Sequence, residues 1–295
     1  MSDGLEFTGE RFTPECVREI WYEHVHRYVF AREFVSGLHV LDAACGEGYG
    51  SALLARRAAS VVGVDISEEA VTHAQDRYTA NNLSFQAADG TALPFDDDTF
   101  DCVVSFETLE HLHDQEGLLT EFRRVLNPGG FLLISTPDKA VYTDRQKNDN
   151  AFHVAELYRG EFENLLAGYF PAVRLWGHKL MFHSAIWSLE EGGGGAVMHQ
   201  AHDAGDVESG ARPAHDPVYF LAFCAADAAA LPDATAALWL FDDAVESVYA
   251  HYYHEIRKNM SAGEVLAQRE REIQRLEAEL EAARRPWWRR LTRRG

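Results

Sequence analysis

The sequence predicts an α/β domain built on a doubly wound, parallel sheet of seven strands, and three observations support this fold class. Apolar runs of strand length alternate with helical patterns from residue 38 onward. These runs are apolar almost throughout, which is typical of strands covered on both faces. The first of them leads directly into a glycine-rich turn. An N-terminal helix, a glycine-rich insertion and a C-terminal helical tail complete the prediction.

The N-terminal segment, residues 1–37, is expected to cap the domain and to form a helix from Thr13 to Ser36-Gly37, because threonine is a good helix cap and Pro14 suits the first helical position. The main domain follows over 38–230. Its predicted strands are 38–43, 60–65, 83–88, 100–106, 131–136, 172–178 and 217–225. Its predicted helices run from the glycine-rich turn to about 57, from Ser67 onward, over 115–126 and over 154–168, with a turn at 127–130.

Three further segments are predicted around and after these strands. Residues 190–216 are rich in glycine and lack periodicity, so they are expected to form a flexible insertion. Residues 231–262 predict a helical extension, with helix over 240–259. Residues 263–295 predict a short coiled coil and a basic Trp/Arg tail. The heptad core positions are Leu266, Ile273, Leu276, Leu280 and Ala283. A coiled coil of this kind could form a homodimer.

The composition is that of a globular protein, with 46% hydrophobic and 25% charged residues, but the net charge is −20. A body this acidic does not favour binding to nucleic acid. The only basic cluster is the tail, where Arg284–Gly295 contain six arginines and no acidic residue. Trp287 and Trp288 lie among them, so the tail is a candidate for peripheral membrane contact.

The cellular location is expected to be cytoplasmic. The four cysteines are widely spaced and form no C-x-x-C pair, which fits a reducing compartment. No run of eighteen apolar residues indicates a membrane span, and the polar N-terminus does not resemble a signal peptide.

The most informative motif is the run VLDAACGEGYG at 40–50, in which glycines follow a strand and open a helix. Glycine allows the backbone to turn sharply and to approach a ligand. Asp65 ends the second strand, 19 residues after Gly46, where a carboxylate can accept from two ribose hydroxyls. Asp89 follows the third strand. A dinucleotide dehydrogenase would normally show G-x-G-x-x-G, whereas the spacing here is G-x-G-x-G.

Over residues 38–137 the chain resembles the class I S-adenosylmethionine-dependent methyltransferases. The matching segments are VLDAACGEGYG, VVGVDIS, AADGTALPFDDDTFD, VVSFETLEHL and LNPGGFLLISTP. The resemblance implies a Rossmann-like sheet, S-adenosylmethionine as cofactor, a ribose site at Asp65, an adenine site at Asp89 and a methionine site near the glycines. The full set of cofactor residues that it implies is Asp42, Ala44, Gly46, Gly48, Asp65, Ile66, Asp89, Gly90, Ser105 and Phe106.

The segment after the fourth strand carries the candidate catalytic residues. In a single helical turn, Glu107, Glu110 and His111 would share one face. This E-x-x-E-H motif, together with NAFHVAE at 150–156, resembles the small-RNA 3′-terminal 2′-O-methyltransferases, and the ubiquinone-pathway catechol O-methyltransferases have a similar motif. The resemblance implies a divalent metal such as Mg²⁺ or Mn²⁺, bound by Glu107, Glu110, His111 and His153.

The bound metal would lower the pKa of an acceptor hydroxyl. Two alternatives remain open. The Glu110-His111 pair can buttress the site without a metal, and His111 or His153 can then act as a general base. His113 and His178 are interpreted as structural or exposed.

The leading motifs suggest an acceptor class. FTGERFTPE at 7–15 and W-x-E-H-x-H-R-Y-x-F-A at 21–31 resemble a bacterial methyltransferase group associated with glycan assembly, in which Arg11 could pair with the cofactor carboxylate. We therefore expect O-methylation of a sugar hydroxyl in a glycan, glycolipid or nucleotide-linked sugar. The alternatives are a natural-product O- or N-methyltransferase, an RNA 2′-O-methyltransferase, and a scaffold that retains the fold without activity.

Overall fold

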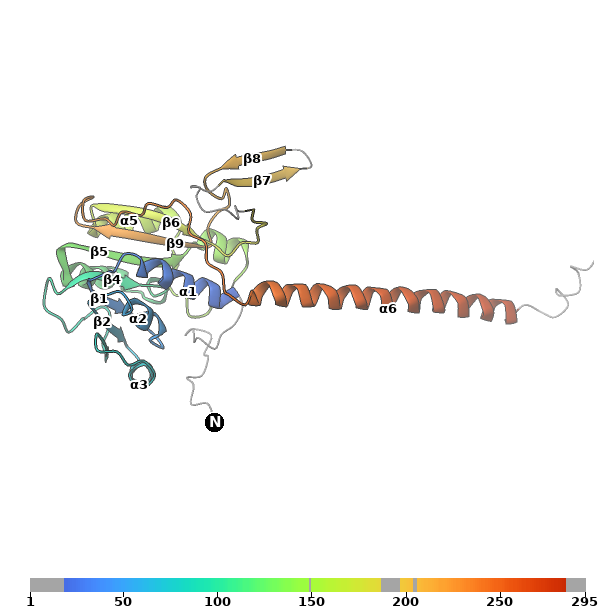
Figure 1. Cartoon of the computed structure of the whole chain (residues 1–295), viewed down its shortest axis with the longest axis horizontal. Coiled ribbons are helices and arrows are strands. Elements are labelled where there is room, and N and C mark those ends of the chain that lie inside the picture. Colours follow the sequence, from blue (N-terminus) through green and yellow to red (C-terminus); the bar gives the residue numbers. More distant parts are fainter. Residues whose placement is uncertain (1–18, 149, 187–196, 204–205, 285–295) are drawn as a thin grey trace, which may run out of the picture. The chain divides into compact units, whose positions relative to one another are not determined.

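A computed structural model describes residues 19–148, 150–186, 197–203 and 206–284 of the chain (Figure 1). The chain divides into two units, residues 1–241 and 242–295, which we describe separately. The first unit contains the α/β domain, and the second contains one long helix. Arg11, the predicted start of the first helix at Thr13, and the Trp/Arg tail after Arg284 lie outside the described residues.

The first unit contains a seven-stranded sheet in the order β3-β2-β1-β4-β5-β9-β6, which confirms the predicted fold class. The strands are β1 (His39–Ala43), β2 (Ser60–Asp65), β3 (Leu83–Ala87), β4 (Phe100–Ser105), β5 (Leu126–Pro137), β6 (Ala172–His178) and β9 (Tyr219–Ala225). All neighbours pair in parallel except β9, which is antiparallel to both β5 and β6. Because β1 lies between β2 and β4, the chain reverses its winding direction there, and open α/β sheets place their ligands at the carboxyl ends of such strands.

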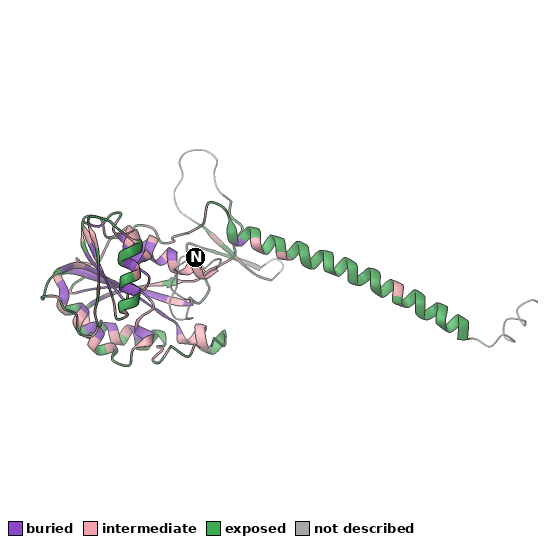
Figure 2. Cartoon of the chain, turned by 90° about the horizontal axis from the view of Figure 1, so that it is seen from below, coloured by how far each residue is buried: buried purple, intermediate pink, exposed green. Residues whose placement is uncertain are grey.

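Helices cover both faces of the sheet. The helices of the first unit are α1 (Glu19–Arg32), α2 (Tyr49–Leu54), α3 (Glu68–Arg77), α4 (Gln115–Val125) and α5 (Arg159–Tyr169). One core cluster joins α4 and α5 to one face of the sheet, and another joins α1 and α2 to the opposite face. Alternate strand residues point to the two faces: Leu132 and Ile134 of β5 join the first cluster, and Phe131 and Leu133 join the second. Figure 2 shows the buried residues concentrated on these strands.

Two predicted helix boundaries are wrong. Helix α1 ends at Arg32 rather than at Ser36. Its last turn closes with a hydrogen bond between residues three apart, from Glu33 N to Phe30 O (3.2 Å), and the chain then turns toward β1. Helix α5 begins at Arg159 rather than at residue 154. The preceding N–H groups of Val154 and Ala155 donate instead to the backbone oxygen of Glu110 (2.9 and 3.0 Å), which draws this segment to the end of β4.

Other predicted segments are also corrected. The turn at 127–130 is part of β5, where the register with β4 shifts between Phe100 and Cys102. Part of the expected flexible insertion is a hairpin of β7 (Met198–Asp203) and β8 (Asp206–Gly210). Residues 231–246 contain no helix, so the predicted helical extension there is wrong. A short helical element η2 (Ala140–Arg145), which the sequence did not indicate, follows β5.

The second unit contains a single helix, α6 (Ser247–Arg284), in place of a helical extension followed by a separate short coiled coil. Among the described residues no helix is both long and apolar enough to cross a membrane.

Candidate active site

The glycine-rich turn between β1 and α2 has the backbone geometry that its sequence predicts. Gly46 and Gly48 have φ angles of 55° and 93°, and Ala44 between them and β1 has a φ of 61°. A side chain on Gly48 would meet Cβ of Ala74 in α3 at 2.7 Å. Glycine is therefore required at Gly48 both for its conformation and for the close approach of α3.

Asp65, at the end of β2, ties this turn to the next helix. One of its carboxylate oxygens accepts from the N–H of Gly46 and the other from the N–H of Ser67, both at 2.9 Å. The next residue, Ile66, is 74% exposed, so an apolar side chain lies open beside the carboxylate. A ribose at Asp65 with an adenine against Ile66 would cover that surface.

Asp89 occupies the equivalent position after β3. Only one of its carboxylate oxygens is used in the structure, accepting from the N–H and the hydroxyl of Thr91 (2.8 and 2.7 Å). These bonds lower the pKa of Asp89 below its usual value, so the residue is ionised and its second oxygen can accept from a ligand. Gly90 follows it, and a side chain there would meet Leu118 at 2.8 Å.

Asp42 lies in the strand that leads into the turn. It is fully buried in β1, and its two oxygens accept from the hydroxyls of Tyr28 (3.0 Å) and Ser51 (2.6 Å). Burial raises the pKa of Asp42 to about 7, despite these two hydrogen bonds. Both oxygens are thus occupied by side chains of α1 and α2, so the geometry gives Asp42 a positioning role.

The sequence did not indicate a role for Glu47, which lies inside the turn. This buried carboxylate contacts three side chains of the α3 region: His73 at 3.0 Å, Arg77 at 2.9 Å and the hydroxyl of Tyr78 at 2.7 Å. Its position between two glycines gave no separate signal, because its partners lie 26 to 31 residues away.

The end of β4 lies next to the turn and contributes Ser105 and Phe106. The hydroxyl of Ser105 is buried, and none of the described residues forms a hydrogen bond with it. The ring of Phe106 packs edge-on against Tyr28, with 5.0 Å between centroids. A nucleoside with a polar amino-acid tail would need hydrogen-bonding groups around the turn. The structure provides the Ser105 hydroxyl, the glycine turn, and Asp65 and Asp89, whose carboxylates can accept further hydrogen bonds. The residues present therefore fit S-adenosylmethionine.

Glu110 stands out among the buried acidic residues. It belongs to the short helical element η1 (Leu109–His111), and its Oε2 accepts from the hydroxyl of Thr136 at 3.1 Å. Its Oε1 is buried and has no hydrogen-bond partner in the part of the chain that the structure describes. Burial and the nearby charge of Glu107 raise the pKa of Glu110 well above its usual value. A buried carboxylate oxygen without a partner is costly unless a cation meets it or the group takes up a proton, which the raised pKa favours.

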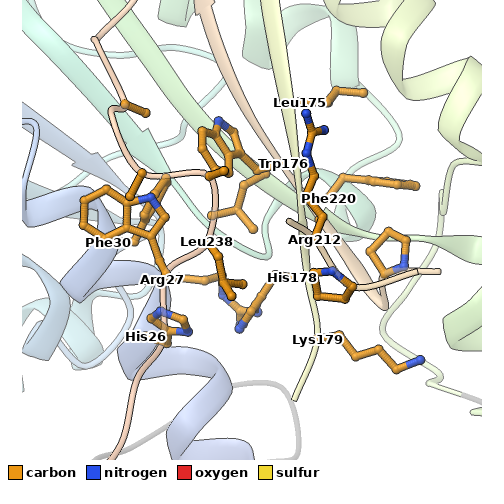
Figure 3. Close-up of a pocket in the computed structure, with 18 of the residues that line it drawn as sticks. His26, Arg27, Phe30, Leu175, Trp176, His178, Lys179, Arg212, Phe220 and Leu238 are labelled. Carbon is orange, nitrogen blue, oxygen red and sulfur yellow. The ribbon is translucent and has the colours of Figure 1, made fainter. Parts of the chain in front are cut away.

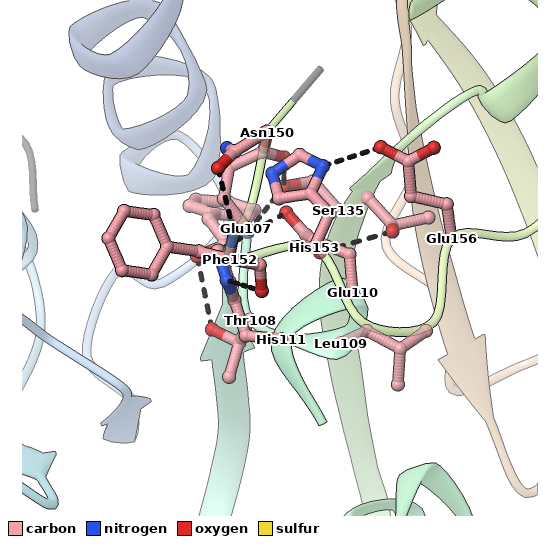
Figure 4. A network of polar contacts seen from close by, with 12 residues as sticks. Glu107, Thr108, Leu109, Glu110, His111, Ser135, Asn150, Phe152, His153 and Glu156 are labelled. Carbon is pink, nitrogen blue, oxygen red and sulfur yellow. Dashed lines mark hydrogen bonds and ion pairs between the residues drawn. The ribbon is translucent and has the colours of Figure 1, made fainter. Parts of the chain in front are cut away.

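Two histidines lie close to the Glu110 side chain, as Figure 4 shows. Each of Glu110, His111 and His153 offers a ligand atom within 4.8 Å of the others, and Nε2 of His111 is 3.9 Å from Oε1 of Glu110. His111 donates through Nδ1 to the backbone oxygen of Phe152 (3.0 Å), because a carbonyl can only accept. His153 contacts Oε1 of Glu156 through Nδ1 at 2.6 Å. With Nδ1 of each ring held in this way, Nε2 is the ring nitrogen that would meet a metal ion bound between them.

Glu107, the fourth predicted ligand, lies beside this group in a different arrangement. Its φ of 51° places it outside η1, so the expected single helical turn shared by Glu107, Glu110 and His111 is not formed. One oxygen accepts from the hydroxyl of Ser135 at 2.6 Å, and the other is 3.8 Å from Nη2 of the buried Arg27. These contacts hold the Glu107 carboxylate toward Ser135 and Arg27.

His113 and His178, the two further histidines considered in the sequence, are not part of this group. His113 is exposed. His178, at the end of β6, lies 3.4 Å from Nη1 of Arg27, and burial and the charge of Arg27 lower its pKa well below the usual value. A series of ring contacts leads from His178 to His153. His178 contacts Tyr219, Tyr219 contacts Tyr142, and Tyr142 stacks on His153 with 5.2 Å between ring centroids.

Arg27, Tyr142 and Tyr219 were missed by sequence reasoning, because each comes from an element distant from the E-x-x-E-H motif and no spacing links them to it. Glu156 lies within the NAFHVAE motif, but the sequence did not assign it a role. The W-x-E-H-x-H-R-Y run contained Arg27, but the sequence could not show that this arginine is turned inward.

Comparison with known proteins agrees with the fold and the turn. Residues 41–134 match the family model described as "Methyltransferase domain". A "Probable S-adenosylmethionine-dependent methyltransferase" of Mycolicibacterium smegmatis is 37% identical over 169 residues, which cover 56% of this chain and 65% of that protein. The ubiquinone biosynthesis O-methyltransferase of Coxiella burnetii is 34% identical over 114 residues, covering 37% of this chain and 48% of that protein.

Two further matches have similar limits. A fatty-acid O-methyltransferase of M. smegmatis is 38% identical over 106 residues, which cover 35% of this chain and 38% of that protein. The YcgJ protein of Bacillus has a crystal structure that covers 52% of this chain and 72% of its own, with 23% identity and a TM-score of 0.46. The chain thus spans less than two thirds of the length of the curated relatives named here.

The sheet order and the glycine turn with its acidic strand ends form an α/β Rossmann-like fold of the methyltransferase type. Residues 41–134 match the family model for a methyltransferase domain.

Proposed function

We propose that the protein is an S-adenosylmethionine-dependent O-methyltransferase that uses a divalent metal and methylates a sugar hydroxyl adjacent to a second hydroxyl. The observation that carries this proposal is the convergence of Glu110, His111 and His153 beside the end of β4. The unpartnered Oε1 of Glu110 and the fixed Nδ1 atoms of both histidines are what a metal site requires of its ligands and of the residues that orient them.

The donor set favours a metal with some affinity for imidazole. Two imidazoles and one carboxylate suit Mn²⁺, Fe²⁺, Co²⁺ or Zn²⁺ better than Mg²⁺, although Mg²⁺ is abundant in cells. Glu107 is a fourth candidate ligand. Such a metal would lower the pKa of an acceptor hydroxyl, while S-adenosylmethionine supplies a methyl group on a positively charged sulfur.

The residues of the chain then have distinct tasks. Asp65 and Asp89 hold the cofactor nucleoside, and Ser105 and Phe106 lie at the strand end beside the glycine turn. Glu156 and the backbone oxygen of Phe152 fix the ring orientations of His153 and His111. In the transfer, the acceptor oxygen forms a bond to the methyl carbon, the sulfur keeps the electron pair of the broken bond, and the hydroxyl proton leaves to water or to a nearby base.

The choice of oxygen and of a sugar rests on chemistry and on relatives. Two of the relatives are named O-methyltransferases. A vicinal diol can bind a metal through both oxygens, and sugars are a common source of vicinal diols. The net charge of −20 makes an RNA acceptor a weaker candidate.

The experiment that tests this proposal is metal analysis of the purified full chain after incubation with Mn²⁺ and desalting. We expect one metal per chain in the wild type and in the matched control His113→Ala, since His113 is exposed and outside the group. His153→Ala should retain less than a tenth of that amount. S-adenosylmethionine binding is measured calorimetrically in the same samples, with and without chelator.

The absence of metal from the wild type, with S-adenosylmethionine still bound, would contradict the metal site. It would favour the alternative that His153, held by Glu156, acts as a general base toward a natural-product acceptor. Methyl transfer from labelled S-adenosylmethionine to a panel of sugars, phenols and amines would then decide between the acceptors.

A further inference from the structure

A cavity of about 700 Å³ lies between α1, β6, β9 and residues 234–239. Figure 3 shows His26, Arg27 and Phe30 of α1 on one wall and Trp176 and His178 of β6 on another. We call this space the basic cavity, because its positively charged lining residues are Arg27, Arg159, Arg174, Lys179 and Arg212. Its volume is in the range that takes a small organic molecule.

The charge of the lining is opposite to that of the chain. The sequence has 47 acidic residues and 27 lysines and arginines, yet the described residues that line the basic cavity include no aspartate or glutamate. Asp216, next to lining residues in the sequence, is paired with Arg145 at 2.8 Å. Burial and Arg27 lower the pKa of His26 to about 4, so the positive charge near pH 7 comes from arginine and lysine.

Three of these cations lack an acidic partner among the residues that the structure describes. Arg174 donates only to the backbone oxygen of Pro232 (2.9 Å), and Lys179 only to that of Asp216 (3.3 Å). Arg212 makes no hydrogen bond or ion pair within the described ranges. Cations gathered in a concave site without counter-charge attract an anion.

The cavity walls also contain buried donors without acceptors. Nη2 of Arg27 and the indole Nε1 atoms of Trp176 and Trp239 are buried and have no hydrogen-bond partner among the described residues, although Nη2 faces Oε2 of Glu107 at 3.8 Å. All three residues line the basic cavity. Buried donors are normally satisfied, so these three point to a ligand rich in acceptor oxygens. Phe30 and Leu238 provide an apolar surface beside them.

The basic cavity is linked to the candidate metal site through Arg27. Arg27, which lines it, lies 3.8 Å from Glu107 and 3.4 Å from His178. Burial acts to lower the pKa of Arg27, but Glu107, Tyr219 and Glu23 together raise it above the usual value, so Arg27 stays charged. One side chain therefore connects the two sites, and a single acceptor can reach both.

We propose that the basic cavity binds the phosphate groups of the acceptor, and that the acceptor is a phosphorylated sugar such as a nucleoside diphosphate-linked sugar. Phosphate oxygens match both the unpaired cations and the unpartnered N–H donors, and the apolar wall can contact a base or a sugar ring. This inference rests on the proposed sugar O-methylation and specifies its substrate class.

The test is calorimetric binding of pyrophosphate and of uridine diphosphate to the full chain at 150 mM salt, where purely long-range attraction is screened. We expect both probes to bind to the wild type, and the double variant Lys179→Gln/Arg212→Gln to bind at least tenfold more weakly. Trp239→Phe keeps an aromatic ring but removes one N–H donor, so it should weaken binding about threefold. Arg56→Gln removes an exposed charge outside the cavity and should bind as the wild type does.

Tighter binding of uridine diphosphate than of pyrophosphate would support a nucleotide-linked acceptor, and equal binding would support a simpler sugar phosphate. Failure of both probes to bind at 1 mM, or equal binding by the wild type and the double variant, would overturn the inference. Metal and S-adenosylmethionine binding are measured on the same protein. If these persist without pyrophosphate binding, only the cavity assignment fails; if pyrophosphate binds through the cavity but no metal does, only the metal function fails.

Discussion

Glu156 holds Nδ1 of His153 at 2.6 Å, and its other oxygen accepts from the hydroxyl of Thr143 in η2. The imidazole orientation is therefore set by a carboxylate three residues further along the chain, which is itself fixed by another element. This segment remains at the site because the N–H groups of Val154 and Ala155 both donate to the backbone oxygen of Glu110. The position of His153 thus depends on Glu156 of the same motif and on Thr143 and Glu110, which lie outside it.

We predict that Glu156→Gln weakens metal binding by 10- to 100-fold, since loss of an orienting carboxylate usually costs that much. The readout is a competitive Mn²⁺ titration monitored by metal content. Glu163→Gln is the matched control, because the side chain of Glu163 is 41% exposed and pairs with Arg159, away from the histidines. Equal metal affinity for Glu156→Gln and the wild type would show that Glu156 does not position a ligand.

A second prediction concerns the cofactor. Asp65→Ala should weaken S-adenosylmethionine binding at least tenfold, about 1.4 kcal/mol, because it removes the ribose acceptor and releases the N–H groups of Gly46 and Ser67. Calorimetry measures the affinity. Asp76→Ala, an exposed aspartate in α3, controls for the lost charge. Unchanged affinity in Asp65→Ala would mean that the nucleoside binds elsewhere.

The parts of the fold that were predictable are those with local signals. The glycines of the turn, the apolar strands and Ser67 as the cap of α3 all depend on residues close in sequence, and the structure contains each of them. The predicted start of α5 at residue 154 was wrong, because the N–H groups of Val154 and Ala155 donate to the distant backbone oxygen of Glu110. The hairpin of β7 and β8 was missed because its strands carry few apolar residues and show no clear alternation.

The same distinction between local signals and long-range contacts applies to the candidate site. Glu110, His111 and His153 were identified from motifs and do come together. Arg27 was not identified as part of the site, because a buried arginine on an amphipathic helix has the same sequence pattern as an exposed one. The basic cavity combines α1 with β6, β9 and residues 234–239, and the contact between segments some 150 residues apart leaves no trace in spacing.

A third prediction concerns stability and pH. Asp42 has a pKa of about 7 in the folded protein, compared with its usual value of 3.8. A group whose pKa is raised on folding stabilises the folded state fully below the unfolded pKa, and this stabilisation is lost as pH rises to the folded value. Asp42 should thus lower the free energy of unfolding by up to about 4 kcal/mol between pH 4 and pH 7, with no further change above that range.

Asp42→Asn keeps the size of the side chain and removes the titration. Urea unfolding of this variant should show a smaller loss of stability between pH 4 and pH 7 than the wild type. Comparison with Asp101→Asn, on the same sheet but not buried, isolates the effect of burial. Parallel pH profiles for Asp42→Asn and the wild type would contradict the raised pKa.

The last prediction concerns α6, the helix of the second unit. Leu266, Ile273, Leu276 and Leu280 lie at heptad spacing on this helix, and each is half or more exposed. A row of exposed apolar side chains along a 38-residue helix is typical of a helix that pairs with another copy. We therefore propose that the protein forms a dimer through α6.

Ile273→Glu would place two glutamates in the paired seam and should weaken dimerisation at least a hundredfold, as light scattering over a dilution series would show. Gln274→Glu adds the same charge one residue away, outside the seam, and should leave the dimer intact. A wild-type chain that remains monomeric at 100 μM, or equal dimerisation by the two variants, would show that this row of side chains does not mediate self-association.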